Sequence, residues 1–437
     1  MARLNTAPAQ RRTHEGAPAA IISPIAELRR TVLACMLWES GFYESGQAIA
    51  DRIAELVKRC KPHEVAELAI EARNKQRLRH APLLLVRAMA AMKSTGSLVS
   101  DTLREVIQRP DELAEFLAIY WKDGRQPLSK QVKKGLARAF RKFDAYQLAK
   151  YNRDGEIKLR DVLFLVHAKP RDEAQAAVWK QLVDGTLPAP DTWEVALSGG
   201  ADKRETFERL IGEGKLGYLA LLRNLRNMAD AGVSSKLVGD ALEAGAEKSK
   251  ALPFRYVAAA RAVPAWEPMI DNAMMKALGG MARLPGRTVV LLDVSGSMGE
   301  RLSTKSDLSR LDAACALAVL VRGICDDVRV LSFSNHVAEV PPRHGMALID
   351  AIRGSQPHGG TYLGAAVRLL DSKVDYDRLI VITDEQSHDV VPAPKGRGYM
   401  INVACNKNGV GYGQWLKVDG WSEAVVSYIQ ALESSEI

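Results

Sequence analysis

The stretch Thr288-Val-Val-Leu-Leu-Asp-Val-Ser-Gly-Ser297 decides the fold class of the C-terminal part of the chain. Its β-branched, apolar beginning predicts a buried strand, and Asp293 stands where that strand ends. A carboxylate at the carboxyl end of a parallel strand lies at the edge where such sheets bind ligands. Asp293, Ser295 and Ser297 then offer three hard oxygen atoms, which suit Mg²⁺ better than zinc or copper.

The pattern around this stretch extends the same prediction over residues 285–437. Apolar runs predict further strands at 328–333, 379–384 and 400–405, with helices over about 308–325 and 421–432. Because strands alternate with helices, we expect a doubly wound, mainly parallel sheet covered on both faces. Thr361 begins a helix after two glycines and Asp384 ends a strand, so both lie where a metal site on this sheet edge would need them.

Residues 23–284 have a different pattern, in which apolar residues recur at helical spacing. Period-two alternation is nearly absent, and helix-starting residues such as Ser23, Asp111 and Ser129 precede the apolar periods. Many helices with brief connections favour an α-solenoid over a single bundle. Residues 1–22 contain arginines but no apolar core of a secretory signal, so we expect a flexible arm there.

Composition limits the class of protein. The 437 residues are 47% hydrophobic and 26% charged, which excludes disordered and fibrous classes and fits two or three globular domains. No run of about 18 apolar residues is present, so we expect no membrane span. The five cysteines form no CxxC pair, which argues against a zinc site or disulfide framework and favours a cytoplasmic location.

The charge is distributed unevenly. Residues 1–280 hold 44 basic and 34 acidic residues, a net of +10, whereas residues 281–437 hold 16 and 18, a net of −2. Residues 51–150 alone carry 21 basic and 12 acidic residues, a net of +9. A basic domain joined to a neutral one indicates that one part meets a polyanion, although a solvated helical surface explains the charge alone equally well.

A helical projection of residues 128–142 separates cations from apolar side chains. The cations on or beside one face are Lys130, Lys133, Lys134, Arg138, Arg141 and Lys142. Like charges at i,i+4 destabilise a helix by a few tenths of a kcal/mol per pair, a cost that an anionic ligand would offset. A second basic cluster, Arg73 to His80, has the alternative of a favourable contact at a helix C-terminus.

Motifs for catalysis are missing from the sequence. Ser297 lacks the preceding glycine of a nucleophile elbow, and the chain contains neither a GxxxxGK[ST] phosphate loop nor an HExxH motif. We therefore expect a binding protein without enzymatic activity.

The ordered set of a DxSxS string, a threonine and an aspartate resembles the von Willebrand factor A-type domain. The residues that match its metal-ion-dependent adhesion site are Asp293, Ser295, Ser297, Thr361 and Asp384. The resemblance implies a divalent metal, expected to be Mg²⁺, that leaves one coordination position for an acidic group of a protein partner. The alternative is a vestigial site in which Asp293 only caps a turn.

Several segments upstream resemble, in order, the TROVE module of the Ro autoantigen family. They are residues 30–45, the basic helix, 149–153, 163–170 and 220–225. The resemblance implies HEAT-like repeats over 23–284, closed into a ring and followed by the C-terminal domain. It also implies RNA contacts at Lys150, Arg153 and His167, although a lone histidine in an apolar helix is more often a core residue.

The same resemblance implies the function. Ro proteins bind small structured noncoding Y RNAs on an outer basic surface and single-stranded ends of misfolded RNA at the ring hole. They act in RNA quality control with an exoribonuclease such as polynucleotide phosphorylase, and we expect a monomer here. The alternative is a metal-dependent protein-interaction adaptor without a direct RNA role.

Overall fold

The computed structural model describes most of the chain. The described residues are 11–19, 21–33, 46–75, 77–92, 95–152, 155–249, 251–302, 307–404, 408–411, 413–419, 426, 429–430 and 433. Most of residues 30–45 and of the helix predicted at 421–432 therefore lie outside them. Within the described part, no helix is both long and apolar enough to cross a membrane.

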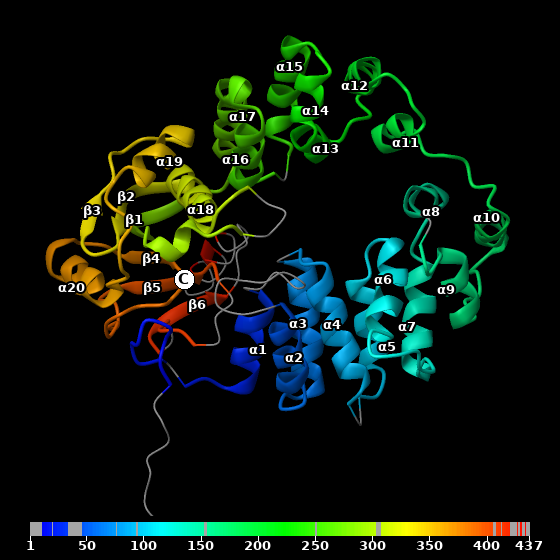
Figure 1. The fold of residues 1–437 in the computed structure, drawn as a ribbon, viewed down its shortest axis with the longest axis horizontal. Helices are drawn as coiled ribbons and strands as arrows, with labels where there is room; N and C mark the ends of the chain where they lie inside the picture. Colours follow the sequence, from blue (N-terminus) through cyan, green and yellow to red (C-terminus); the bar gives the residue numbers. More distant parts are fainter. Residues whose placement is uncertain are drawn as a thin grey trace, which may run out of the picture. The chain divides into compact units, whose positions relative to one another are not determined.

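Helices occupy the chain from Pro24 to Gly279, as the sequence predicts (Figure 1). They are α1 (Pro24–Leu33), α2 (Gly46–Val57), α3 (Pro62–Asn74), α4 (His80–Ala90), α5 (Leu98–Val106), α6 (Asp111–Tyr120), α7 (Lys130–Phe140), α8 (Ala145–Tyr151), α9 (Leu159–Val166), α10 (Glu173–Asp184), α11 (Trp193–Ser198), α12 (Lys203–Gly212), α13 (Tyr218–Arg223), α14 (Leu225–Asp230), α15 (Ser235–Ala246), α16 (Pro253–Ala262) and α17 (Glu267–Gly279). Three further helices, α18 (Arg310–Ile324), α19 (Gly345–Arg353) and α20 (Leu363–Lys373), alternate with strands.

The chain forms two compact units, and the division between them falls within the helical region. One unit contains residues 23–33 and 47–196, and the other contains residues 1–22, 34–46 and 197–437. The last helices of the helical region therefore pack as one body with the α/β domain.

In the first unit, helices pack on their second neighbours along the chain. Helix α1 contacts α3, α3 contacts α5, α5 contacts α7 and α7 contacts α9, while α4 contacts α6 (Figure 1). This is the layered stacking of an α-solenoid, the arrangement predicted from the sequence. Helices α5 and α7 approach each other closely at Gly135, where an added Cβ would lie 2.8 Å from the Cβ of Leu103.

In the second unit, polar contacts fix helices α16 and α17 to the α/β domain. Arg261 on α16 donates to Asp312 on α18 at 3.3 Å, and Arg353 on α19 pairs with the same carboxylate. At the start of α19, the backbone N–H of Met346 donates to Asp271 on α17 at 3.0 Å. The carboxylate of Asp271 therefore satisfies a backbone donor at a helix N-terminus.

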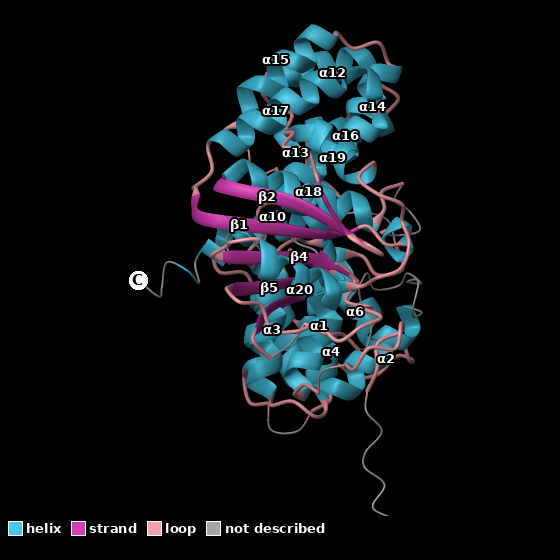
Figure 2. Ribbon diagram, turned by 90° about the vertical axis from the view of Figure 1, so that its left-hand side faces the viewer, coloured by secondary structure: helices cyan, strands magenta, loops and turns pink. Residues whose placement is uncertain are grey.

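The α/β domain contains one six-stranded sheet (Figure 2). Its strands are β1 (Leu284–Asp293), β2 (Cys325–Phe333), β3 (Val337–Glu339), β4 (Arg378–Thr383), β5 (Arg397–Asn402) and β6 (Trp415–Asp419), in the order β3-β2-β1-β4-β5-β6. All neighbouring strands are parallel except β2 and β3. The predicted parallel sheet is confirmed, and β3 and β6 are additions to it.

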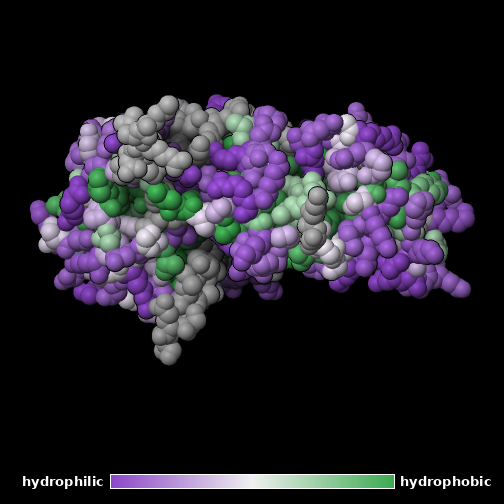
Figure 3. All heavy atoms as spheres, turned by 90° about the horizontal axis from the view of Figure 1, so that it is seen from below, coloured by the Kyte–Doolittle hydropathy of each residue, from purple (hydrophilic) through white to green (hydrophobic). Residues whose placement is uncertain are grey.

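Both faces of the central strand β1 are buried. On one face Val289 and Leu291 belong to a cluster with Val367 and Leu370 of α20. Val290 and Leu292 are also buried, and they point to the opposite face because successive side chains of a strand alternate. The apolar run of β1 thus follows from its position inside a doubly wound sheet. On the surface, Figure 3 shows a face where hydrophilic residues predominate and hydrophobic residues form smaller groups.

The close approach of α7 to α5 gives a matched test of packing. We expect Gly135→Ala to destabilise the protein, because the new Cβ would lie 2.8 Å from Leu103 and 3.0 Å from the Cα of Ser100. Overpacking costs about 1–3 kcal/mol, which exceeds the gain of up to about 1 kcal/mol in helix propensity. Gly212→Ala in α12, where the Cβ meets nothing within 4 Å, should be neutral or stabilising in the same urea titration. A Gly135→Ala protein as stable as the Gly212→Ala protein would contradict this packing.

Candidate nucleic-acid interface and metal site

The predicted metal-binding carboxylates lie at one edge of the sheet, because β1 and β4 are adjacent and parallel. Asp293 ends β1 and Asp384 follows β4, and both side chains are fully buried. Asp293 accepts a hydrogen bond from the hydroxyl of Thr383 at 2.6 Å and another from the backbone N–H of Ser295 at 2.9 Å. These bonds fix the orientation of the Asp293 carboxylate.

Two loops bring the predicted hydroxyl ligands to the same edge. The hydroxyls of Ser295 and Ser297 lie 3.3 Å apart, and the backbone N–H of Gly296 donates to the carbonyl of Gly359 at 3.1 Å. The second bond joins the loop after β1 to the loop that carries Thr361, whose side chain is buried. The structure therefore gathers the five predicted residues, from the end of β1 and from three loops, at one edge.

The electrostatics of this edge fit a cation. Burial and the neighbouring carboxylate of Asp384 raise the pKa of Asp293 to about 7. A divalent ion would relieve this repulsion, and hard carboxylate and hydroxyl oxygens are the donors that Mg²⁺ prefers. Among the described residues, no group of three or more His, Cys, Asp or Glu side chains could hold a metal, so a metal here would need the Ser and Thr oxygens.

Arg310 is a further charged residue at this edge that the sequence did not reveal. It is buried, its Nη1 lies 3.8 Å from Oδ2 of Asp384, and it donates to the carbonyl of Ser297 at 3.4 Å. Its guanidinium partly neutralises Asp384. No motif marks this position, because Arg310 reaches the edge only through the path of the loop before α18.

A small hairpin from the N-terminal segment packs beside this edge. Residues 11–19 turn at Gly16, with a φ of 98°, and the N–H of Thr13 donates to the carbonyl of Ala17 at 2.9 Å. This part of the segment differs from the flexible arm predicted for residues 1–22. The physical reason is burial, since Thr13 and Ala17 are buried although the segment lacks an apolar run.

Three polar contacts hold the hairpin on the loop after β4. The Thr13 hydroxyl donates to the carbonyl of Ser387 at 2.9 Å, and the N–H of His14 donates to the side chain of Gln386 at 2.7 Å. The carboxylate of Glu15 lies 3.0 Å from Nε2 of His388. Because Nδ1 of His388 is 3.1 Å from the backbone N of Thr361, the hairpin is linked to the loop of a predicted metal ligand.

The predicted basic helix forms as α7, and half of its predicted cations form no ion pair in the described structure. Ser129 caps the helix by accepting from the N–H of Val132 at 3.3 Å. Lys130 and Lys134 are exposed and Lys133 is half-buried. In the part of the chain that the structure describes, none of these three lysines forms an ion pair.

The other three cations of the basic segment bind within the protein. Arg138 pairs with Asp101 on α5, and Arg141 donates to the carbonyl of Lys169 at 2.7 Å. Lys142 donates to the carbonyls of Arg104 and Ile107 at the end of α5, and burial lowers its pKa. Helix α7 ends at Phe140, so Arg141 and Lys142 lie beyond it. Of the six predicted cations, four therefore lie on α7, and three of these form no ion pair in the described part of the chain.

The remaining predicted RNA contacts lie at two helix ends. Lys150 is half-buried near the end of α8, with Nζ 6.0 Å from the centre of the Tyr151 ring. His167 is exposed and ends α9 in a left-handed conformation with a φ of 52°. It is not a core histidine, which removes that alternative. Arg153 lies outside the described residues.

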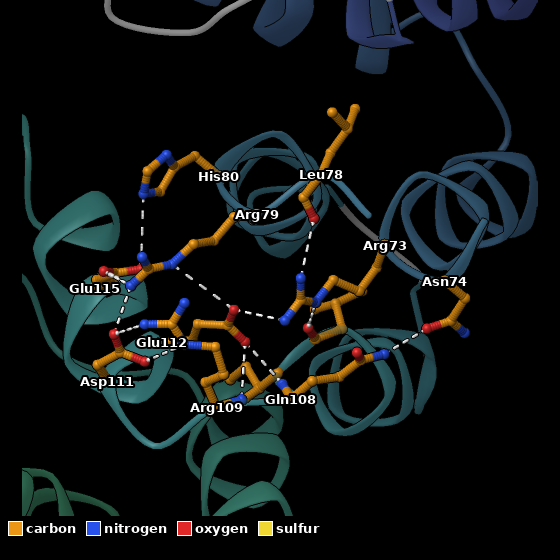
Figure 4. A network of polar contacts seen from close by, with 12 residues as sticks. Arg73, Asn74, Leu78, Arg79, His80, Gln108, Arg109, Asp111, Glu112 and Glu115 are labelled. Carbon is orange, nitrogen blue, oxygen red and sulfur yellow. Dashed lines mark hydrogen bonds and ion pairs between the residues drawn. The ribbon is translucent and has the colours of Figure 1, made fainter. Parts of the chain in front are cut away.

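Two arginines of the second basic cluster have structural partners (Figure 4). Arg73 is buried and pairs with the buried Glu112 at 2.6 Å, while Arg79 pairs with Asp111 at 2.6 Å and with Glu115. Removing one member of such a buried pair costs about 3–5 kcal/mol because the other charge is left unpaired. Arg73 and Arg79 thus join α3 and α4 to α6, whereas Lys75 and Arg77 are exposed and, among the described residues, form no ion pair.

The pKa of Asp293 gives a pH-dependent prediction for Mg²⁺. Without metal, the folded protein keeps the Asp293 proton up to about pH 7, whereas the unfolded chain loses it near pH 4. Folding stability should therefore fall as the pH rises through this range, and Mg²⁺ should stabilise more at about pH 8 than at about pH 5.5. At a hundredfold excess over its Kd, the stabilisation would be about 2.7 kcal/mol.

Thermal melting with and without Mg²⁺ at the two pH values measures this difference. Asp293→Asn should abolish the Mg²⁺ effect and leave RNA binding nearly unchanged. Equal melting temperatures with and without Mg²⁺ at the higher pH would contradict metal binding at this edge.

Known proteins resemble the chain in both parts. The TROVE domain model matches residues 185–283, and the von Willebrand factor type A domain model matches residues 288–386. The RNA-binding protein RO60 of Deinococcus radiodurans is 25% identical over 416 residues, covering 79% of this chain and 78% of that protein. Telomerase protein component 1 of Mus musculus is 40% identical over 76 residues, but this covers 16% of the chain and only 3% of that much longer protein.

A solved structure shares the fold. The crystal structure of the Deinococcus radiodurans RO (RSR) protein superposes with a TM-score of 0.66 at 20% identity, covering 95% of this chain and 100% of that one. The predicted resemblance to the Ro family is thus confirmed, because the TROVE domain model and the von Willebrand factor type A domain model match the chain in the predicted order.

Proposed function

We propose that this protein binds RNA through the surface formed by α7, α8 and α9, and that it acts by binding rather than by catalysis. Residues 128–171 carry 12 basic and 4 acidic residues, a net charge of +8 that equals the net charge of the whole chain. A relative matched over 79% of the chain is named an RNA-binding protein, and this name supports RNA as the polyanion that binds here. Phosphate neutralisation supplies most of the affinity of such surfaces.

One observation carries the proposal: Lys130, Lys133 and Lys134 stand together at the start of α7, and none forms an ion pair in the described part of the chain. Cations in the first turn of a helix are unfavourable because the N-terminus already carries partial positive charge. An RNA phosphate at this position would relieve both the repulsion among the lysines and the unfavourable dipole interaction.

The finer function follows the resemblance to Ro proteins. We infer that small structured, Y-like RNA binds the basic surface that includes Lys150, Arg153 and His167. Single-stranded ends of misfolded RNA would be the second ligand, and an exoribonuclease would act on the bound RNA. The exposed His167 supports this inference, because an imidazole can stack on a base and donate to a phosphate.

A second function, gripping an acidic protein partner through a metal ion, is favoured by the buried pair of Asp293 and Asp384. Mg²⁺ held by these carboxylates with Ser295, Ser297 and Thr361 would supply a Lewis-acidic position for a partner's carboxylate. RNA binding and this adaptor role are compatible, since the lysines of α7 and the metal edge belong to different compact units.

The salt dependence of RNA binding tests the lysines of α7. Replacing Lys130, Lys133 and Lys134 by Ala should flatten the plot of log K against log salt by about 2 for single-stranded RNA, at ~0.7 per phosphate contact. The control is the exposed triple Lys203, Lys236 and Lys248 of the second unit, which changes the net charge equally. Filter binding of a single-stranded RNA of about 20 nucleotides, between about 50 and 200 mM salt, measures both slopes. Identical slopes for the two triples would show that α7 is merely solvated.

His167→Asn tests the imidazole without disturbing the backbone, because asparagine tolerates the left-handed conformation found there. We expect affinity for structured RNA to fall at least about tenfold, equivalent to about 1.4 kcal/mol, with little change in melting temperature. His336→Asn, at another exposed histidine, is the control. Full retention of structured-RNA binding by His167→Asn would remove His167 from the interface.

A further inference from the structure

Helix α9 and its C-terminal cap carry an exposed strip of three side chains. Arg160, Phe164 and His167 are all exposed, and the Phe164 side chain is 60% exposed. Arg160 and Phe164, at i and i+4, lie on one side of the helix, and His167 follows just beyond the last turn in a left-handed conformation. The apolar residues of α9 that pack inward are Leu159, Val162, Leu163 and Val166.

Phe164 departs from the other phenylalanines that the structure describes. The buried ones are Phe116, Phe140, Phe143, Phe207 and Phe333, and Phe254 is half-buried. Helix α9 already has a complete apolar face, so packing within its unit does not require Phe164. A large ring that the fold does not bury is available for a contact with another molecule.

The surroundings of Phe164 identify the chemistry of that contact. Arg160 forms no ion pair in the part of the chain that the structure describes, and His167 is open to solvent. Helix α9 packs beside α7, whose first turns carry the three lysines described above. A protein partner with an apolar patch would have to bury these cations, whereas a polyanion with flat aromatic groups satisfies both the ring and the charges.

We propose that Arg160, Phe164 and His167 form a binding strip for unpaired bases of single-stranded RNA. A base stacks on the ring of Phe164, and Arg160 and His167 contact the phosphates on either side of it. Along the helix axis the Cα atoms of these residues are separated by about 6 Å and about 4.5 Å. Only an unpaired base presents its face, so the strip selects single-stranded segments over duplex.

This proposal rests on the proposed RNA-binding function and names the ligand at that surface. The probe is a single-stranded RNA of about 12 nucleotides, within the roughly 4–16 nucleotides of a single-strand site. It carries one 2-aminopurine, whose fluorescence falls when it stacks, and it is compared with the same sequence as a duplex. The full chain is tested as wild type, Phe164→Ala and Phe164→Trp. Leu219→Ala is the matched control, since Leu219 is an exposed apolar residue of the second unit.

We expect Phe164→Ala to weaken single-stranded RNA binding about tenfold and to abolish the quenching, because one stacked base contributes roughly that much. Phe164→Trp should keep both, Leu219→Ala should behave as wild type, and duplex affinity should change less than about twofold. Melting temperatures should agree among the variants, because Phe164 packs against little.

Two results would overturn the strip while leaving RNA binding intact. One is wild-type affinity and quenching in Phe164→Ala, and a concomitant loss of self-association in sedimentation would reassign Phe164 to a protein contact. The other is an equal loss of single-stranded and duplex binding, which would exclude stacking on unpaired bases. Wild-type protein that binds neither RNA would instead overturn the proposed function itself.

Discussion

The close packing of α7 against α5 determines which cations of the basic segment can meet a ligand. Gly135 lets the two helices approach until no Cβ fits between them. At this separation Arg138 reaches Asp101, and Lys142 reaches the carbonyl groups at the end of α5. Arg138 and Lys142 therefore stabilise the packing of the two helices, and the cations without an ion pair lie in the first turns of α7.

The unpaired lysines at the start of α7 lower the stability of the helix and at the same time favour the binding of an anion. Lysines in the first turns of a helix are held against both mutual repulsion and the helix dipole, so a phosphate ligand there gains more than at a neutral surface. Helix α9 packs on α7 and adds an exposed aromatic ring between an arginine and a histidine. Charge on one helix and a stacking group on its neighbour are the two components of single-strand binding sites.

The order of elements and the central strands could be predicted from the sequence, because local patterns determine them. The run before Asp293 is apolar since β1 is buried on both faces, and the N-cap at Ser129 predicts the start of α7. Strand β3 was missed because three residues beside β2 carry no apolar run, and β6 because Lys417 interrupts its apolar pattern. Phe164 lies in the segment 163–170 that resembles the TROVE module, but its exposure depends on a helix register that the sequence alone does not settle.

Partners that lie far apart along the chain explain the other differences between the predictions from the sequence and the structure. The acids that hold Arg138 and Arg79 lie more than 30 residues away along the chain, so a helical projection counts such cations as free. The hairpin at residues 11–19 finds its partners at Gln386 and Ser387, at the far end of the sequence. Arg310 approaches Asp384 in the same way. The meeting of Asp293, Ser295, Ser297 and Asp384 at one sheet edge was predictable because they lie at or just after strand ends, whereas the groups that surround them were not.

The most direct test of the account is a map of where single-stranded RNA touches the full chain. Photo-cross-linking of an RNA that carries 4-thiouridine, followed by mass spectrometry of the peptides, gives that map. We expect cross-links within residues 128–171, centred on the first turns of α7 and on α9. Cross-links confined to residues 197–437, with none in the basic segment, would contradict it.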